Sequence, residues 1–120
     1  MLPQIMSEVS VPGWAGQFEG AITLCDREGI IVYMNEASIR QFQKYGGEKL
    51  LGSNLLDCHP EPARSKLVAL LKSPVKNVYS TEKNGVHRLV MQAPWMEQEV
   101  CRGLVEISFE IPHPLPHFVR

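Results

Sequence analysis

The chain has 120 residues, of which 44% are hydrophobic, and it carries a formal net charge of −1 at pH 7. These values fit one globular domain and exclude a disordered chain, and the scattered lysines and arginines predict no nucleic-acid partner. Because no apolar run approaches the roughly 18 residues that cross a bilayer, and no signal-peptide pattern opens the chain, we expect a cytoplasmic protein without a membrane partner.

An N-terminal helix is predicted first, because apolar residues recur at the helical spacing before Pro12 and Gly13 end the pattern. These residues are Leu2, Ile5, Met6 and Val9. At the other end of the chain, residues 113–120 form a proline-rich tail that is predicted to be extended.

The next segment predicts a β-hairpin that leads into a short helix. Residues 21–26 and 30–34 read as strands on either side of a turn at Arg27-Glu28-Gly29. Asn35 is a favourable N-cap, since its side-chain oxygen accepts from the free backbone N–H groups of a first helical turn. The helix that follows is predicted to bury Ala37, Ile39 and Phe42.

Further helices are predicted before the chain becomes a sheet. Two short helical pieces lie between residues 48 and 56, separated by Gly52, and a longer helix covers residues 61–72. The longer helix carries an apolar stripe formed by Leu67, Val68, Leu70 and Leu71.

The C-terminal half predicts three antiparallel strands. Residues 76–83 and 86–96 flank Asn84-Gly85, a pair that tolerates the positive φ of a type I′ hairpin turn. After a turn at residues 97–99, apolar and polar residues alternate in the last strand, which predicts one buried and one polar face. The buried face is predicted to hold Cys101, Gly103, Val105, Ile107, Phe109 and Ile111, and the polar face Arg102, Glu106, Ser108 and Glu110. Leu104 interrupts the polar face, which indicates that part of that face is covered.

These elements predict an α+β fold, with a sheet of five antiparallel strands, helices packed on one face and an N-terminal cap helix. The run from Asp26 to Ala37, with an acidic residue ending a strand, a glycine turn and an asparagine before a helix, resembles the opening of a PAS domain. Leu50-Leu51-Gly52 resembles the step between the middle helices of that family. The resemblance covers residues 18–112 as one domain, and it implies that residues 1–17 form an N-terminal cap helix and lead-in. It also implies a curved sheet that encloses a ligand or a dry core beneath the helices.

The same resemblance implies a function in signal transduction. PAS domains sense light, oxygen, redox state or small metabolites, and pass the change to a partner through the outer face of the sheet or through terminal helices. We therefore expect a bacterial sensory, ligand-binding and protein-interaction module that acts in trans on a partner protein. The amphipathic first helix and Leu104 favour a homodimer. The absence of a nucleophile elbow, a phosphate loop, a metalloprotease helix and a kinase motif predicts a protein that is not an enzyme.

A small-molecule pocket is expected between the sheet and the helices. Its predicted walls are Tyr33, Met34, Phe42, Met91 and Trp95, and its predicted polar contacts are Asn54 and His59. The same residue types also build ordinary cores, so a core without a ligand is the alternative.

Cys58-His59-Pro60 raises the alternative of a haem-binding protein, because haem iron takes an imidazole or a thiolate that faces the pocket. The competing interpretation is that His59 caps the helix that follows or packs against Asp57. Flavin–cysteinyl chemistry is disfavoured, since Leu55 stands where the resemblance places the reactive cysteine. The other three histidines are predicted at the surface, with a spacing that predicts no metal site.

Overall fold

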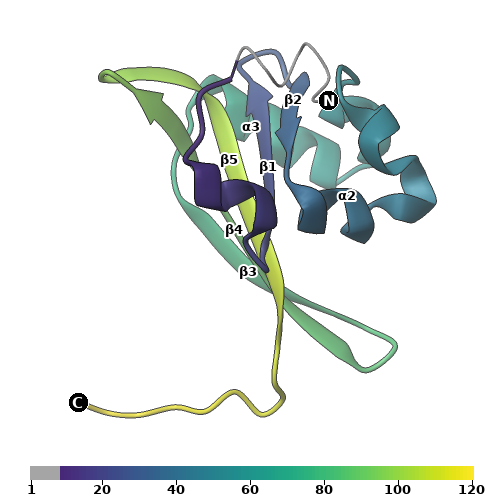
Figure 1. Ribbon diagram of the computed structural model, residues 1–120, viewed down its shortest axis with the longest axis vertical. Helices are drawn as coiled ribbons and strands as arrows, with labels where there is room; N and C mark the ends of the chain where they lie inside the picture. The colour runs from purple at the N-terminus through teal and green to yellow at the C-terminus, as the bar shows by residue number, and fades with distance from the viewer. Residues whose placement is uncertain (1–8) are drawn as a thin grey trace.

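The computed structural model describes residues 9–120, except for the side chain of Cys58. The predicted first helix falls on residues 1–8 and so lies outside the described part of the chain, apart from Val9. The described elements are η1 (Gly13–Gln17), β1 (Ala21–Asp26), β2 (Ile31–Met34), α2 (Glu36–Gln41), η2 (Gln43–Tyr45), η3 (Gly47–Leu50), η4 (Leu55–Cys58), α3 (Ala63–Lys72), β3 (Asn77–Lys83), β4 (Val86–Glu97) and β5 (Val100–Ile111), where η denotes a 3-10 helix (Figure 1).

The strands form one sheet in the order β2-β1-β5-β4-β3, and every neighbouring pair is antiparallel. Helices α2 and α3 cover one face, called the inner face below, whereas η1 lies against the outer face (Figure 1). The predicted fold class, an α+β domain with a five-stranded sheet and helices on one face, is confirmed.

The turn between β1 and β2 is held by Asp26. Its Oδ1 accepts hydrogen bonds from the backbone N–H groups of Glu28 (2.9 Å) and Ile30 (3.0 Å), while Gly29 adopts the left-handed φ of +90° that the turn needs. Arg27 leaves the same turn and donates to the carbonyl oxygens of Leu71 and Lys72. These carbonyls lie at the C-terminus of α3, where a cation is favourable, so the turn also anchors that helix.

Asn35 joins four segments through one buried side chain, which is 2% exposed. Its Oδ1 accepts from the N–H of Ser38, as an N-cap does, and from the N–H of Ile22 in β1, both at 2.9 Å. Its Nδ2 donates to the carbonyl oxygens of Ala15 in η1 and of Gly20, also at 2.9 Å. The prediction of a helix cap is confirmed, and the side chain also fixes η1 to the sheet.

Two hydrophobic cores lie on the two faces of the sheet. The outer core centres on Ala15, Ile22, Leu24 and Tyr33, with Val9 and Val11 of the N-terminal segment packed against it. The inner core joins Cys25 and Leu104 of the sheet to Leu67 and Leu71 of α3. Both leucines belong to the predicted apolar stripe of that helix, so α3 buries the expected side. The helix begins at Ala63 rather than at residue 61.

The face of β5 that was predicted to be polar is the one that lies beneath the helices. Leu104 and Ser108 are each 3% exposed and face the helices, whereas Phe109, predicted to be buried, is 39% exposed on the outer face. β5 pairs with β1 on one side and β4 on the other, and each of its faces contributes to a hydrophobic core. Alternation in such a central strand separates two environments without indicating which one lies beneath the helices. Because Leu104 is buried in the inner core, it no longer favours a homodimer.

Replacing Asn35 with alanine should lower the free energy of unfolding by about 2–4 kcal/mol, because a helix cap is lost and buried backbone groups lose their partners. Asn54→Ala is the matched control, since Asn54 caps η4 through the Leu56 N–H (2.8 Å) from a partly exposed position. This control should cost about 1 kcal/mol. Urea denaturation measures both values, and equal losses would contradict the role assigned to Asn35.

Gly103 tests the close approach of β5 to β1. A Cβ at this position would lie 1.8 Å from the carbonyl oxygen of Cys25, which is backbone and cannot move aside. Gly103→Ala should therefore destabilise the protein by more than about 3 kcal/mol. At Gly13, where a Cβ would meet nothing within 4 Å, alanine should change stability little. Thermal unfolding of the two variants compares them, and similar midpoints would contradict this packing.

Candidate functional site

A cavity of about 300 Å³ lies between the inner face of the sheet and the helical segment from α2 to η4. Such a volume is at the lower end of the range for small-molecule pockets. Its apolar wall comes from Met34, Phe42, Leu50 and Leu55, and Val90 closes it from β4. Three further side chains complete the boundary at the sheet and at the helices, namely Ile31, Tyr45 and Tyr79.

A row of polar side chains crosses the inner face at the level of this cavity. The row runs across four neighbouring strands in the spatial order β1-β5-β4-β3, and each of its residues pairs with the next one. These residues are Thr23, Glu106, Gln92 and Asn77. Asn77 donates to Gln92 at 2.9 Å, and Gln92 donates to Oε1 of Glu106 at 3.1 Å. The Thr23 hydroxyl shares a 2.6 Å hydrogen bond with Ser38 of α2. Thr23 and Glu106 border the cavity itself, so its floor is polar where its wall is apolar.

Glu106 is the acidic group on that floor. Burial raises the pKa of its carboxyl, and the hydrogen bond from Gln92 and the charge of a protonated His59 oppose this effect. Its partial exposure is explained by the cavity that it lines. Glu106 was predicted on a solvated outer face of β5, and this prediction is wrong. Glu106 lies on the same face of the strand as Leu104, which is beneath the helices. Burial and the negative charge of Glu106 also raise the pKa of Tyr79.

His59 stands at the same end of the cavity as Glu106. Its Nδ1 lies 2.7 Å from the carbonyl oxygen of Leu55, an atom that can only accept, so Nδ1 carries a proton. In the neutral imidazole, Nε2 then holds the lone pair and serves as an acceptor or a ligand. His59 and Tyr79 also border a second groove, beside α3, and so separate it from the cavity.

The opposite end of the cavity is basic. Arg88 of β4 donates to Oε1 of Gln41 (3.3 Å) and lies 3.8 Å from the carboxylate of Glu110. Ser108 donates to the same Gln41 oxygen at 2.9 Å. Glu106 and Glu110 are four residues apart on one strand, a separation of roughly 13 Å, so the acidic and basic groups bordering the cavity lie at different ends.

Three of the predicted pocket residues, Met34, Phe42 and His59, come together at this cavity. Asn54 instead uses its side chain structurally, accepting from Leu56 and donating to the Glu28 carbonyl oxygen. Cys58 belongs to η4, but its side chain is outside the description. A binding role for any of these residues stays a prediction.

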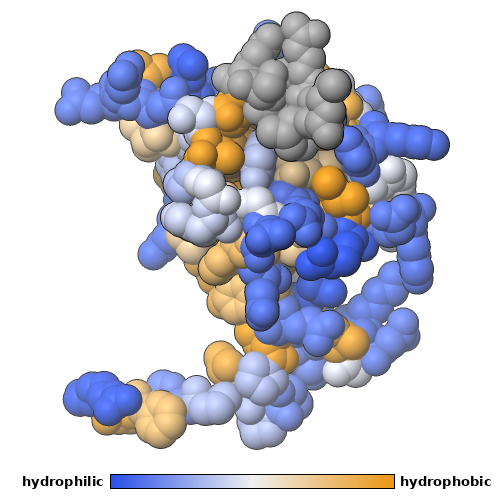
Figure 2. All heavy atoms as spheres, in the orientation of Figure 1, coloured by the Kyte–Doolittle hydropathy of each residue, from blue (hydrophilic) through white to orange (hydrophobic). Residues whose placement is uncertain are grey.

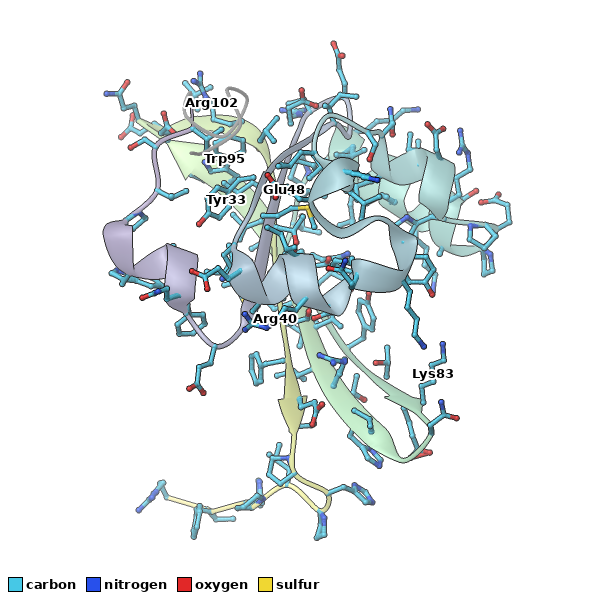
Figure 3. The ribbon with its side chains drawn as sticks, turned by 45° about the vertical axis from the view of Figure 1, so that its right-hand side comes forward. Tyr33, Arg40, Glu48, Lys83, Trp95 and Arg102 are labelled. Atoms are coloured by element: carbon cyan, nitrogen blue, oxygen red, sulfur yellow. The ribbon has the colours of Figure 1, made fainter. Side chains whose placement is uncertain are left out.

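The predicted walls from Tyr33, Met91 and Trp95 do not line this cavity. Tyr33 pairs with Leu24, Met91 with Ile107 and Trp95 with Gly103, all in the register of the outer face. Figure 3 shows Tyr33 and Trp95 next to each other, and both pack in the outer core. The expectation that they face a ligand beneath the helices is corrected, because neighbouring residues of a strand point to opposite faces.

Sequence reasoning missed the polar floor and the basic end. Glu106 and Leu104 are two residues apart in one strand and therefore lie on the same face. Because Leu104 is apolar on a face that is otherwise polar, it was the available signal that this face is covered. Arg88, Gln41 and Thr23 carried no such signal, because their proximity arises from the register of β4, β5 and α2. Within residues 9–120, no group of three or more His, Cys, Asp or Glu side chains is placed to hold a metal ion.

Solved structures resemble this fold over most of the chain. The PAS domain of BvgS from Bordetella pertussis matches with a TM-score of 0.63 at 14% identity, over 82% of this chain and 82% of that chain. The chain has the PAS fold. No protein-family model and no curated protein matches it.

Two other structures with the PAS fold are sensory by their descriptions. A sensory box sensor histidine kinase from Vibrio cholerae matches with a TM-score of 0.56 at 19% identity, over 80% of this chain and 85% of that chain. The Aer2 receptor from Vibrio cholerae, described as a dual PAS-haem oxygen sensor, matches with a TM-score of 0.56 at 19% identity, over 78% of this chain and 95% of that chain. At such identities the likeness establishes the fold.

Removing the charge of Glu106 should change how stability depends on pH. Because the folded protein raises the pKa of this carboxyl above its ordinary value of 4.5, the free energy of unfolding should fall as pH rises from that value through the raised one. Glu106→Gln should lose this component and be more stable than the wild type at neutral pH. Glu97→Gln, on β4 outside the cavity, is the control and should keep the wild-type profile. Parallel profiles for wild type and Glu106→Gln, from urea titrations across this range, would contradict a buried carboxylate.

Proposed function

We propose that the chain is a sensory module of the PAS type that binds a small molecule in the cavity between the sheet and the helices. The observation that carries the proposal is the asymmetry of this cavity, which has an apolar wall, a polar floor and charged groups at both ends. Small-molecule sites combine an apolar lining with a few convergent polar groups in this way. A purely structural core would be expected to fill the space with apolar side chains.

The solved neighbours support a sensory role over a catalytic one, since they include a sensor histidine kinase and an oxygen sensor. In this proposal the module has no catalytic activity and passes its ligand state to a partner protein in trans, in the cytoplasm of a bacterium. Within the described residues, no helix is long and apolar enough to span a bilayer.

Haem is the second candidate ligand, and His59 favours it. The Nδ1 contact with the Leu55 carbonyl orients the ring and leaves Nε2 as a ligand atom, as in many metal-bound histidines. The residues fit only in part, because Glu106 and Thr23 place polar groups on the floor where a macrocycle requires apolar contact. We therefore rank haem below a smaller ligand. Added hemin should give a Soret band that His59→Ala shifts or removes if haem is the ligand.

We also propose that the module forms a homodimer through the outer face of the sheet. The support is a set of apolar side chains on that face, each at least 37% exposed: Val78, Met91 and Phe109. Val78 and Met91 are cross-strand partners, so they form one continuous surface with Ile107. Apolar surface of this kind is what a second copy would cover.

Self-association can be tested with one substitution on each face of β3. Val78→Glu should shift the sedimentation coefficient from dimer to monomer at micromolar concentration, because it places charge in the apolar surface. Tyr79→Ser, on the neighbouring residue, should leave the coefficient unchanged. A monomeric wild type would contradict the homodimer.

Ligand binding can be tested with two adjacent residues of β4 that point to opposite faces. Val90 borders the cavity and is 7% exposed, whereas Met91 is 37% exposed on the outer face. Val90→Phe should fill the cavity and reduce affinity by more than about tenfold, while Met91→Phe should retain wild-type affinity. Native mass spectrometry of freshly purified protein detects a retained ligand, and saturation-transfer NMR measures added fragments. Equal binding by both variants would place the site elsewhere, and no binding by the wild type would contradict the proposal.

A further inference from the structure

Glu106 has an incomplete set of partners inside the cavity. Its Oε1 accepts from Gln92, and no ion pair joins it to a cation among residues 9–120. Every fully buried side-chain nitrogen or oxygen of the described residues has a hydrogen-bond partner. Oε2 has none among them, so this atom is not fully buried, and Glu106 borders the cavity. The floor thus presents a carboxylate oxygen that protein atoms do not satisfy.

The neighbouring polar groups at this end are also suited to accept hydrogen bonds. His59 uses its Nδ1 proton on the Leu55 carbonyl, so Nε2 is an acceptor whenever the ring is neutral. Thr23 is already engaged with Ser38. The nearby arginine and lysine side chains do not pair with Glu106. Arg88 interacts with Gln41 and Glu110 at the other end of the cavity, and Lys66 lines the groove beside α3.

A carboxylate in a poorly solvated site costs free energy unless a cation or several donors face it. We infer that the cavity selects a small primary amine with an apolar body, whose ammonium group donates to Glu106 Oε2 and His59 Nε2 while its body lies against Met34, Phe42 and Leu55. This inference rests on the proposed function, because it names the ligand class of the same cavity. An ammonium supplies three donors and a permanent positive charge, whereas His59 acts on Glu106 as a cation only when it is protonated.

The distribution of charge sets the orientation of the ligand. Arg88 would repel an amine from the opposite end, so the ammonium group points to Glu106 and the remainder of the molecule extends towards Gln41. A carboxylate ligand would take the reverse orientation. An uncharged ligand would gain little at either end.

Three probes with one carbon skeleton separate these cases: phenethylamine, phenethyl alcohol and phenylacetate. NMR titration of the isotope-labelled 120-residue chain at neutral pH gives each dissociation constant from the amide signals of cavity residues. Phenethylamine should bind at least roughly tenfold more tightly than phenethyl alcohol, because a charged hydrogen-bonded pair is added. Glu106→Gln should abolish this preference, and Glu97→Gln, outside the cavity, should preserve it.

The outcomes distinguish the inference from the function on which it rests. Binding of the alcohol or the carboxylate as tightly as the amine, or an amine preference that survives Glu106→Gln, would overturn the inference and leave the ligand-binding function standing. If none of the three probes moves a cavity signal, the inference fails, and native mass spectrometry of the freshly purified protein then decides separately whether the cavity holds a ligand. Circular dichroism checks the fold of Glu106→Gln, and if that variant does not fold, the comparison of amine with alcohol on the wild type decides alone.

Discussion

The Asn35 side chain is the interaction on which the rest of the architecture depends. It lies where β2 ends and α2 begins. Its oxygen accepts two hydrogen bonds and its nitrogen donates to three backbone carbonyls, and together these hold the junction against β1 and η1. No aliphatic residue could satisfy these backbone groups, and at a buried site each unsatisfied group is costly. The position of α2, and therefore the helical wall of the cavity, follows from this one amide.

The sheet serves two different purposes on its two faces. Its outer face completes a hydrophobic core with Ala15 and the N-terminal segment, whereas its inner face is shared between an apolar core beneath α3 and the polar floor of the cavity. Cys25 belongs to the dry part, where burial raises the pKa of its thiol to about 11 and keeps it protonated. Glu106 lies two residues beyond Leu104 on the same face of β5, so the change from dry core to polar cavity is abrupt.

Much of the fold follows from local chemistry that a sequence displays. The Asp26–Gly29 turn, the Asn35 cap and the Asn84-Gly85 hairpin use residues whose backbone preferences admit few alternatives, and each element lies within a few residues of its predicted place. The orientation of β5 could not be predicted in this way. Because both faces of this strand contribute to a hydrophobic core, its alternating pattern does not show which face lies beneath the helices. Placing Tyr33 and Trp95 in the pocket failed for the same reason. The pairing of Glu106 with Gln92, or of Arg88 with Gln41, depends on strand register and helix position, which emerge only in the assembled sheet.

The strand order also constrains how the chain can fold. β3, β4 and β5 form consecutive hairpins, so their contacts close over short loops, whereas β1 pairs with β5 across most of the chain, with Ala21 opposite Ser108. Loop closure over such a distance is entropically costly and slows folding. During synthesis, β1 and β2 leave the ribosome before their central partner exists, and α2 and α3 have only half a sheet to cover. The N-terminal hairpin must therefore remain unassembled, and exposed to aggregation or to chaperones, until the last strand is released.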